Sequence, residues 1–218
     1  MVIPPFPLPR NLEEGRLWQE NLRRKVILKP FPIENLRTIG GVDVTYKEGK
    51  GNACIVVFSF PSLEVKEVVY GEKEVDFPYV PGYLAYREIP PILEALKRLS
   101  LLPQILVLDA HGIAHPLRFG LASHLGVHIN HPTIGCAKRK FIGSYEIKEG
   151  ESWGYLVENG EILGIAVLPE KGKKPFFVSP GHLVDVETSF EIIIRTLKGY
   201  SLPEVTRIPH LYLKRVLL

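Results

Sequence analysis

The stretch Ile105-Leu106-Val107-Leu108-Asp109-Ala110-His111-Gly112 decides the fold of this chain. Its first four residues form a wholly apolar run that is followed by turn residues, which predicts a short strand buried on both faces. Asp109 then lies at the carboxyl end of that strand, where open α/β sheets place their ligands. A second β-type run, residues 38–46, carries Asp43 in its interior. Because aspartate is depleted in strands, surface placement explains neither residue well, and both are candidates for function.

The composition is that of an ordinary globular protein with a weak basic bias. The 218 residues are 45% hydrophobic and 23% charged, and the net charge of +3 permits a polyanionic partner without requiring one. The length fits one domain, so we expect a single domain over residues 1–218, with a Pro-rich N-terminal extension at residues 1–10. Cys54 and Cys136 match neither a zinc spacing nor a disulfide framework, which favours a reducing compartment.

The N-terminal segment does not resemble a targeting sequence. It lacks the basic region and the apolar core of a signal peptide, and no run in the chain approaches the length of a membrane span. We therefore expect a cytoplasmic protein with no membrane partner, and we expect it to be a monomer.

Periodicity and turn residues predict a chain of mixed helices and strands. The predicted helices cover about residues 11–28, 83–99, 117–126, 185–197 and 205–216, and the predicted strands cover about residues 37–46, 52–60, 63–74, 105–108, 127–130, 155–157 and 162–168. The strands on either side of Pro61-Ser62 predict an antiparallel hairpin. The alternation of helix and strand from residue 83 to residue 130 favours parallel pairing. The expected fold class is therefore α/β, with a mixed central β-sheet flanked by helices.

Three acidic residues are placed where they can form one site. Asp43 and Asp109 on neighbouring strands can approach each other, and a helix packed over the sheet can bring Glu88 toward them. Carboxylates that meet in a half-buried site repel, so they need protons, basic partners or cations. Hard divalent ions such as Mg²⁺ or Mn²⁺ bind oxygen ligands, and two such ions can activate water for phosphodiester hydrolysis. The alternative is that Asp43 caps a turn, Asp109 caps the next helix and Glu88 lies on a helix surface.

Five motifs in order along the chain are specific enough to point to a family. They are Gly41-Val42-Asp43-Val44, Pro78-Tyr79-Val80-Pro81-Gly82-Tyr83-Leu84-Ala85-Tyr86-Arg87-Glu88, Asp109-Ala110-His111-Gly112-Ile113-Ala114-His115-Pro116, Phe119-Gly120-Leu121-Ala122-Ser123-His124-Leu125-Gly126 and Pro132-Thr133-Ile134-Gly135-Cys136-Ala137-Lys138. Together they resemble the endonuclease V family, which are inosine-directed nucleases with an RNase H-like fold. The resemblance extends from the first predicted helix to Arg215 and implies an RNase H-like fold for this chain.

The resemblance implies catalytic roles for five residues. Asp43, Glu88 and Asp109 match the metal-binding carboxylates, and His210 matches a fourth metal-binding position that is an acid or a histidine in the family. Lys138 matches a lysine near the scissile phosphate, where its charge can offset negative charge that develops during cleavage. The implied cofactor is Mg²⁺, with Mn²⁺ able to substitute.

The resemblance also implies how the nucleic acid is bound. The loop Pro78-Tyr79-Val80-Pro81 matches a wedge that fills the gap left by a displaced base, and a stiff loop with a tyrosine ring suits that task. The positions that match the pocket for the flipped hypoxanthine are Gly82, Leu84, Gly112, Leu121 and Gly135. We expect phosphate contacts from His115, Lys138 and Arg139. Taken singly, each of these residues also fits a plainer interpretation as an ordinary turn or a solvated loop residue.

Three residues depart from the family pattern. Ala110 stands where the family usually has glycine, Leu117 where it has a basic residue, and Arg139 where it has serine. We expect Leu117 to weaken a phosphate contact, and Ala110 either strains its turn or indicates that φ is negative there. The seven histidines lack the spacing of zinc ligands.

The predicted function is metal-dependent hydrolysis of DNA at deoxyinosine, the product of adenine deamination. The enzyme would cut the second phosphodiester bond 3′ to the lesion and leave 3′-hydroxyl and 5′-phosphate ends, as a step in DNA repair. Three alternatives stay open: an inosine-specific endoribonuclease acting on RNA, a catalytically silent lesion-binding protein, and a metallohydrolase that does not act on nucleic acid.

Overall fold

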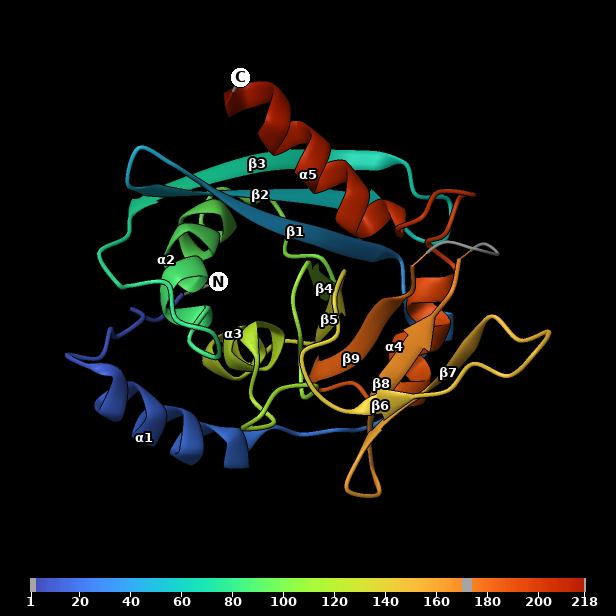
Figure 1. Ribbon diagram of the computed structural model, residues 1–218. Coiled ribbons are helices and arrows are strands. Elements are labelled where there is room, and N and C mark those ends of the chain that lie inside the picture. The colour runs from blue at the N-terminus through green and yellow to red at the C-terminus, as the bar shows by residue number, and fades with distance from the viewer. Residues whose placement is uncertain (1–2, 170–173, 218) are drawn as a thin grey trace.

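The chain is built around one nine-stranded sheet (Figure 1). The computed structural model describes residues 3–169 and 174–217. The strands are β1 (Thr38–Lys47), β2 (Lys50–Ser59), β3 (Val65–Glu74), β4 (Ile105–Leu108), β5 (Thr133–Ala137), β6 (Ser144–Tyr145), β7 (Trp153–Glu158), β8 (Glu161–Val167) and β9 (Phe176–His182). Their order across the sheet is β3-β2-β1-β4-β5-β9-β8-β7-β6.

The sheet combines an antiparallel meander with a parallel centre. Strands β1, β2 and β3 pair antiparallel, β4 lies parallel to β1, and β5 lies parallel to β4. The remaining strands, from β9 to β6, add antiparallel beyond β5. This arrangement confirms the predicted mixed sheet, including the hairpin across Pro61-Ser62.

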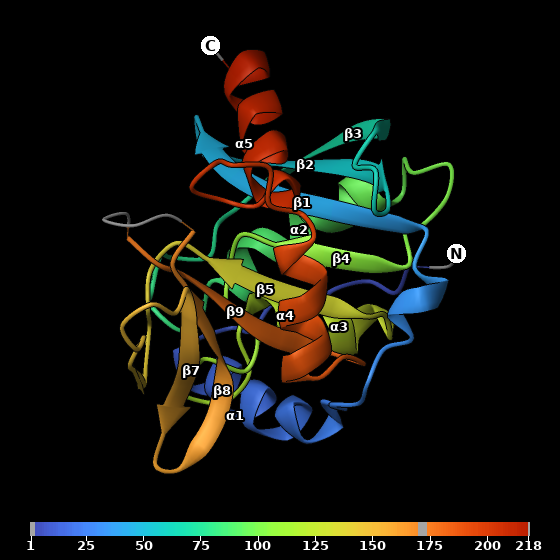
Figure 2. The ribbon, with the colours of Figure 1, turned by 90° about the vertical axis from the view of Figure 1, so that its right-hand side faces the viewer.

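Helices cover both faces of the sheet. They are α1 (Leu12–Leu22), α2 (Ala85–Leu96), α3 (Leu121–Ile129), α4 (Val186–Ile194) and α5 (Glu204–Leu217), with short 3₁₀ helices η1 (Arg23–Lys25) and η2 (Ile33–Asn35). Figure 1 and Figure 2 show α2 and α3 on one face and α4 and α5 on the other. None of the helices in the described part of the chain is long and apolar enough to cross a membrane.

Strand β4 is buried on both faces, as its sequence predicts. Ile105 and Val107 pack in the cluster beneath α4 and α5, whereas Leu106 and Leu108 pack in the cluster beneath α2 and α3. All four side chains are fully buried. Because successive side chains of a strand alternate between faces, an unbroken apolar run is what a strand between two helix layers requires.

The helix predicted at residues 117–126 is present with shifted bounds, and the strand predicted after it is wrong. Residues 127–130 were expected to form a strand, but α3 begins at Leu121 and continues through Ile129. Asn130 then ends the helix in the left-handed conformation, with φ 48°, and its N–H bonds to the carbonyl of Gly126. The next strand is β5, which starts at Thr133. The β-branched residues at the end of α3 imitate a strand, and the Asn130 cap is the feature that marks the true boundary.

Strand β9 was not predicted, because Pro180 and Gly181 signal a break in a strand. In the structure Pro180 pairs with Ile134 next to a register shift, and its carbonyl accepts a hydrogen bond from the N–H of Ile113 at 2.9 Å. The irregularity therefore joins the sheet to the loop that follows β4. Two other boundaries also differ: the first helix ends at Leu22 rather than Leu28, and α2 covers Ala85–Leu96 rather than residues 83–99.

Burial of His124 predicts a specific acid sensitivity. Its ring packs against Phe119, Tyr86 and Phe6, and burial lowers its pKa to about 3. The folded state keeps this histidine neutral, whereas the unfolded state takes up a proton near pH 6.5, so stability contributed by His124 is present above that pH and is lost as the pH falls toward 3. We expect protonation of His124 in the unfolded state to lower the free energy of unfolding by about 2–3 kcal/mol between pH 7 and pH 4.

Chemical denaturation of the wild type and of His124→Phe at both pH values checks this. The variant should lose less stability than the wild type on acidification. Parallel losses in the two proteins would contradict the assignment.

Candidate active site

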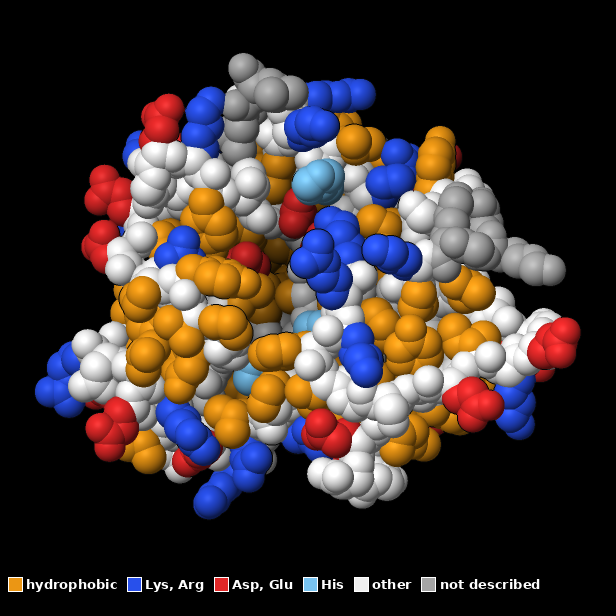
Figure 3. All heavy atoms as spheres, in the orientation of Figure 1, with side chains coloured by type: hydrophobic (Ala, Val, Ile, Leu, Met, Phe, Trp, Pro, Cys, Tyr) orange, Lys and Arg blue, Asp and Glu red, His pale blue; other side chains and the backbone are white. Residues whose placement is uncertain are grey.

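Two hollows lie side by side at the carboxyl ends of β1 and β4. The first, here called the acidic hollow, has a volume of about 260 Å³ and contains five ionisable side chains that the sequence singled out, namely Asp43, Glu88, Asp109, Lys138 and His210. They come from β1, α2, the end of β4, the segment after β5, and α5. The face drawn in Figure 3 shows basic side chains gathered next to acidic and histidine side chains, with a broad hydrophobic area beside them.

Backbone pairing brings the two aspartates together. Val42 of β1 pairs with Leu108 of β4, so the next residue of each strand is an aspartate at the same edge of the sheet. The N–H of Asp109 also bonds to the carbonyl of Val42 at 3.2 Å. Glu88 enters from the first turn of α2, which packs over this part of the sheet.

Close packing of α5 on β1 adds the histidine. A Cβ atom at Gly41 would lie 1.8 Å from the backbone oxygen of Val205, so only glycine allows α5 to approach β1 this closely. His210, further along α5, then reaches Asp43, and its Nδ1 lies 2.9 Å from Asp43 Oδ2. Because a carboxylate accepts, Nδ1–H of the imidazole donates this bond.

The acidic hollow disfavours ionised carboxyls. Burial raises the pKa of Glu88 well above its ordinary value, and the charges of Asp43 and Asp109 raise it further. Burial and then the charge of Asp109 raise the pKa of Asp43, against the opposing effects of His210 and Lys138. The carboxylates in the hollow therefore repel one another, and added positive charge would reduce this repulsion.

Lys138 supplies part of that positive charge. Its ammonium group forms an ion pair with Asp109 Oδ2. Burial acts to lower the pKa of Lys138, but the bond to Asp109 and the charges of Asp109 and Asp43 outweigh it and the pKa is raised. The lysine is thus held charged at the edge of the acidic hollow.

The donors in the acidic hollow have the chemistry that a hard divalent cation requires. Carboxylate oxygens dominate the set, and an imidazole completes it. Within residues 3–169 and 174–217, however, no three His, Cys, Asp or Glu side chains converge on one point as ligands. Asp109 is instead paired with Lys138, and Asp43 with His210. The residues fit a divalent cation by donor type and by charge, while their present contacts are with basic partners.

The second hollow, here called the apolar hollow, adjoins the first and has a volume of about 220 Å³. Leu121 lines both hollows. Of the predicted base-pocket residues, Gly82, Leu84 and Leu121 line the apolar hollow. Tyr79, Val80 and Pro81 line it as well, and the Tyr79 side chain is 71% exposed, so the predicted wedge loop stands at its rim.

Gly112 and Gly135 do not line the apolar hollow. A Cβ atom at Gly135 would lie 2.4 Å from the backbone nitrogen of Gly112, and one at Gly112 would lie 2.0 Å from the carbonyl oxygen of Pro180. The Gly112 N–H also donates to Ser179 Oγ at 2.8 Å. Their small size lets the loop after β4 press against β5 and β9, which supports the hollow from behind.

The residues expected to contact phosphate occupy different surroundings. His115 is buried, its Nδ1 accepts from the N–H of Leu117 at 3.2 Å, and its Nε2 lies 3.2 Å from the carbonyl oxygen of Gly82. Burial lowers the pKa of His115 to about 4, so it is neutral near pH 7 and has no nitrogen free for a phosphate. Lys138 and Arg139 are exposed, and Arg139 lines the apolar hollow.

Sequence reasoning missed several residues of the apolar hollow. They are Gln19, Ala85, Ala110, His111, Phe119, Gly120, Lys140 and Phe141. Lys140 and Phe141 directly follow Lys138 and Arg139, and Ala110 and His111 directly follow Asp109, so adjacency in sequence to predicted site residues was a usable signal for them. Gln19 carried no such signal, because its helix is remote in sequence from every other residue of the hollow. Ala110 is buried and, unlike six other non-glycine residues of the described chain, does not have positive φ, so the glycine of the family pattern is not required there.

Comparison with known proteins gives one consistent result. A sequence model described as Endonuclease V matches residues 20–211. Endonuclease V of Dictyoglomus turgidum is 43% identical over 210 residues, which cover 95% of this chain and 92% of that protein. Among solved structures, Endonuclease V from Streptomyces avermitilis matches with a TM-score of 0.90 and 41% identity, covering 98% of this chain and 96% of that one.

A further solved relative was determined with a nucleic acid. Ciona intestinalis Endonuclease V, in complex with a 24mer DNA containing an inosine followed by a ribo-adenosine, matches with a TM-score of 0.86 and 31% identity over 94% of this chain and 97% of that one. These relatives have an RNase H-like fold, so the predicted fold class is confirmed.

Repulsion in the acidic hollow predicts that removing one charge stabilises the fold. Because the folded-state pKa of Glu88 is raised, the unfolded state loses this proton at a lower pH than the folded state does. The free energy of unfolding therefore falls as the pH rises above the ordinary pKa of a glutamate, and the effect disappears where Glu88 is protonated in both states. With divalent cations chelated, we expect Glu88→Gln to raise the melting temperature near pH 8 and to leave it unchanged near pH 4.

Thermal unfolding across this pH range tests the expectation. Added Mg²⁺ should then stabilise the wild type more than the variant. A lower melting temperature for Glu88→Gln near pH 8 would show that the three carboxyls do not repel.

Proposed function

Because this chain belongs to the endonuclease V family of nucleases, we propose that it is a metal-dependent endonuclease directed at deoxyinosine in DNA. It hydrolyses the second phosphodiester bond 3′ to the lesion and leaves 3′-hydroxyl and 5′-phosphate ends, which makes it a DNA-repair enzyme. The observation that carries the proposal is the adjacency of the two hollows: one gathers carboxylates and a lysine, and the other lies beneath an exposed tyrosine loop.

In this proposal Asp43, Glu88 and Asp109 hold Mg²⁺, or Mn²⁺ in its place, and His210 contributes at the same place. A cation held there would supply positive charge, which would make a water molecule a stronger nucleophile and offset charge on the leaving 3′-oxygen. His210 keeps the Asp43 carboxylate oriented through its Nδ1–H bond. Lys138 holds its charged ammonium group where the scissile phosphate would approach, and so stabilises negative charge that develops during hydrolysis.

The apolar hollow is proposed to receive the flipped hypoxanthine. Its lining is largely hydrophobic and contains Gly82 and Leu121, and a purine ring gains from burial against such surfaces. The loop Pro78–Pro81 would enter the gap that the base leaves, with Tyr79 stacking on a neighbouring base. Because Leu121 lines both hollows, a base held in the apolar hollow would bring the adjoining backbone close to the acidic hollow.

RNA containing inosine is the second candidate substrate. The Ciona relative was solved with an inosine followed by a ribo-adenosine, which motivates a comparison of deoxyribose and ribose strands. Nicking of matched DNA and RNA strands that carry one inosine separates the two candidates. A catalytically silent protein is disfavoured, because all three carboxylates are present in the acidic hollow.

Removal of a metal-binding carboxylate should abolish cleavage while retaining binding. We expect Asp109→Asn to lower the Mg²⁺-dependent nicking rate on a deoxyinosine duplex by about 100-fold or more. Asp185→Asn is the matched control, because Asp185 caps α4 away from both hollows and asparagine can make the same cap. Full activity of Asp109→Asn, or cleavage by the wild type without divalent cations, would refute the assignment.

Tyr79 should contribute to lesion binding more than to folding. Stacking on a base is worth about 1–3 kcal/mol, so Tyr79→Ala should weaken affinity for a deoxyinosine duplex by about 10-fold. The melting temperature should not change, because the side chain is 71% exposed. Fluorescence anisotropy in a chelating buffer measures the affinity, with Tyr155→Ala on β7 as an exposed-tyrosine control. Equal affinity of Tyr79→Ala and the wild type would exclude a wedge.

A further inference from the structure

The carbonyl oxygen of Gly82 is held by two buried side chains. Gln19 Nε2 donates to it at 2.9 Å, and His115 Nε2 lies 3.2 Å away on the same oxygen. Gln19 is 1% exposed and comes from α1, whereas His115 is 5% exposed and comes from the loop after β4. Gly82 directly follows Pro81 and has φ +88°, a conformation that favours glycine. Two remote parts of the chain thus meet at the exit of the Pro78–Pro81 loop.

Only one end of the buried Gln19 amide has a hydrogen-bond partner. A carbonyl oxygen can only accept, so the amide nitrogen of Gln19 must face Gly82, and the amide oxygen Oε1 is left buried without a partner. An unmatched buried acceptor costs about 1–3 kcal/mol, which an apolar side chain of the same length would avoid. A function at Gly82 explains why a polar residue occupies this position.

The loop is fixed at both of its ends. At its entrance, the carbonyl of Phe77 accepts a hydrogen bond from Arg87 Nη1. At its exit, the N–H of Tyr83 bonds to the carbonyl of Val80 at 3.0 Å, next to the clamped Gly82 carbonyl. Tyr79 projects between these two fixed ends, and Gln19, Gly82 and His115 all line the apolar hollow.

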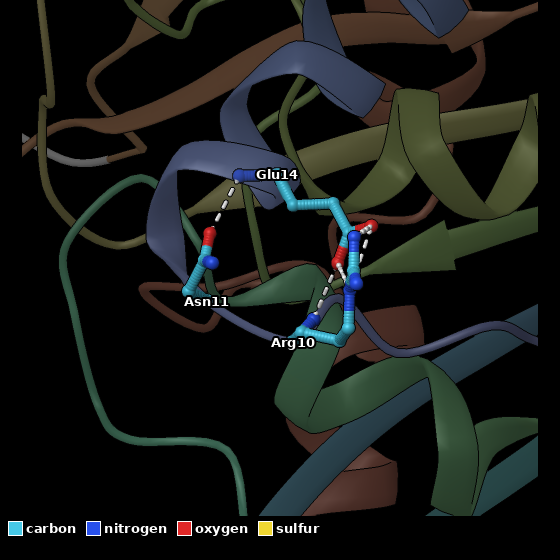
Figure 4. Close-up of polar contacts among 3 residues, drawn as sticks. All are labelled: Arg10, Asn11 and Glu14. Atoms are coloured by element: carbon cyan, nitrogen blue, oxygen red, sulfur yellow. Dashed lines mark hydrogen bonds and ion pairs between the residues drawn. The ribbon is translucent and has the colours of Figure 1, made fainter.

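Helix α1 is itself a firm support for Gln19. Asn11 caps its first turn by accepting from the N–H of Glu14 at 2.9 Å, and the Glu14 carboxylate accepts from the backbone N–H of Arg10 at 2.6 Å (Figure 4). The hydroxyl of Tyr86, on α2, donates to the carbonyl of Gly15 at 2.7 Å. The first turn of α1 is therefore capped by its own residues, and the helix is tied to α2 at one point that does not involve Gly82.

We propose that Gln19 is a positioning residue for lesion recognition, which fixes the exit of the Pro78–Pro81 loop through the Gly82 carbonyl; this inference rests on the proposed function. The clamp keeps the loop in its inserting conformation before DNA arrives, so the entropy of ordering the loop is not lost on binding. His115 shares the same oxygen, so each donor is one half of the clamp. Gln19 does not touch the acidic hollow, so the hydrolytic step on bound DNA does not depend on it.

Single-turnover nicking of a deoxyinosine duplex with Mg²⁺ tests the inference. Gln19→Met keeps the length of the side chain and removes its donor. We expect the half-saturating enzyme concentration to rise about 3- to 10-fold, the value of one lost hydrogen bond, while the maximal rate stays within about twofold of the wild type. The melting temperature should not fall, because the unmatched acceptor is removed together with the donor.

Tyr86→Phe is the matched control, because it removes a hydrogen bond to α1 without touching Gly82. It should leave the half-saturating concentration unchanged. An effect of Gln19→Met that Tyr86→Phe reproduces, a loss confined to the maximal rate, or a half-saturating concentration equal to that of the wild type would overturn the inference.

Amide hydrogen exchange of residues 76–83 in the free protein gives a readout that is independent of activity. Exchange should quicken in Gln19→Met and not in Tyr86→Phe, and unchanged exchange in Gln19→Met would overturn the inference as well. If the wild type does not nick the deoxyinosine duplex, the proposed function fails, while the exchange result still decides whether Gln19 positions the loop.

Discussion

Three carboxyl groups, those of Asp43, Glu88 and Asp109, line one partly buried hollow, and their mutual repulsion weakens the folded state. The protein balances it with basic partners from distant segments: Lys138 pairs with Asp109, and His210 donates to Asp43. Glu88 is left with a strongly raised pKa, so the balance is incomplete. A group of buried charges that weakens the fold is commonly kept for chemistry, and hard cations are the partners that such oxygens favour.

Several structural details exist because the chain must bring these groups together. Parallel pairing of β1 with β4 places two aspartates at the same edge of the sheet, and α2 covers that edge and presents Glu88. Gly41 has no side chain, which lets α5 approach β1 and deliver His210. On the other side, the loop after β4 is pressed onto β5 and β9 by Gly112 and by its bond to Ser179. The loop wall of the apolar hollow is therefore built from the residues that directly follow Asp109.

Much of the fold was predictable because local pattern and burial agree. The apolar run of β4, the hairpin of β2 and β3, and the Asn11 cap of α1 each have a signal in neighbouring residues, and the structure confirms them. The failures occurred where a local signal was misleading. Valine and isoleucine at the end of α3 are typical of strands, so the sequence predicted a strand there. Pro180 argued against a strand at β9, but the irregular pairing beside Ile134 tolerates a residue that regular strands exclude. In both places tertiary contacts outweigh intrinsic preference.

The sequence by itself determined the α/β class, the acidic residues that meet in one hollow, and the exposed tyrosine loop, because each is written in a short run of residues. Only the tertiary structure decided the partners of those residues. His115, expected to contact phosphate, is buried against Gly82 and Leu117, and Gly112 and Gly135 serve packing rather than lining the hollow. Gln19 reaches the carbonyl of Gly82 from a helix 63 residues away in sequence. Contacts of this kind depend on how whole elements pack, and no local pattern of residues encodes them.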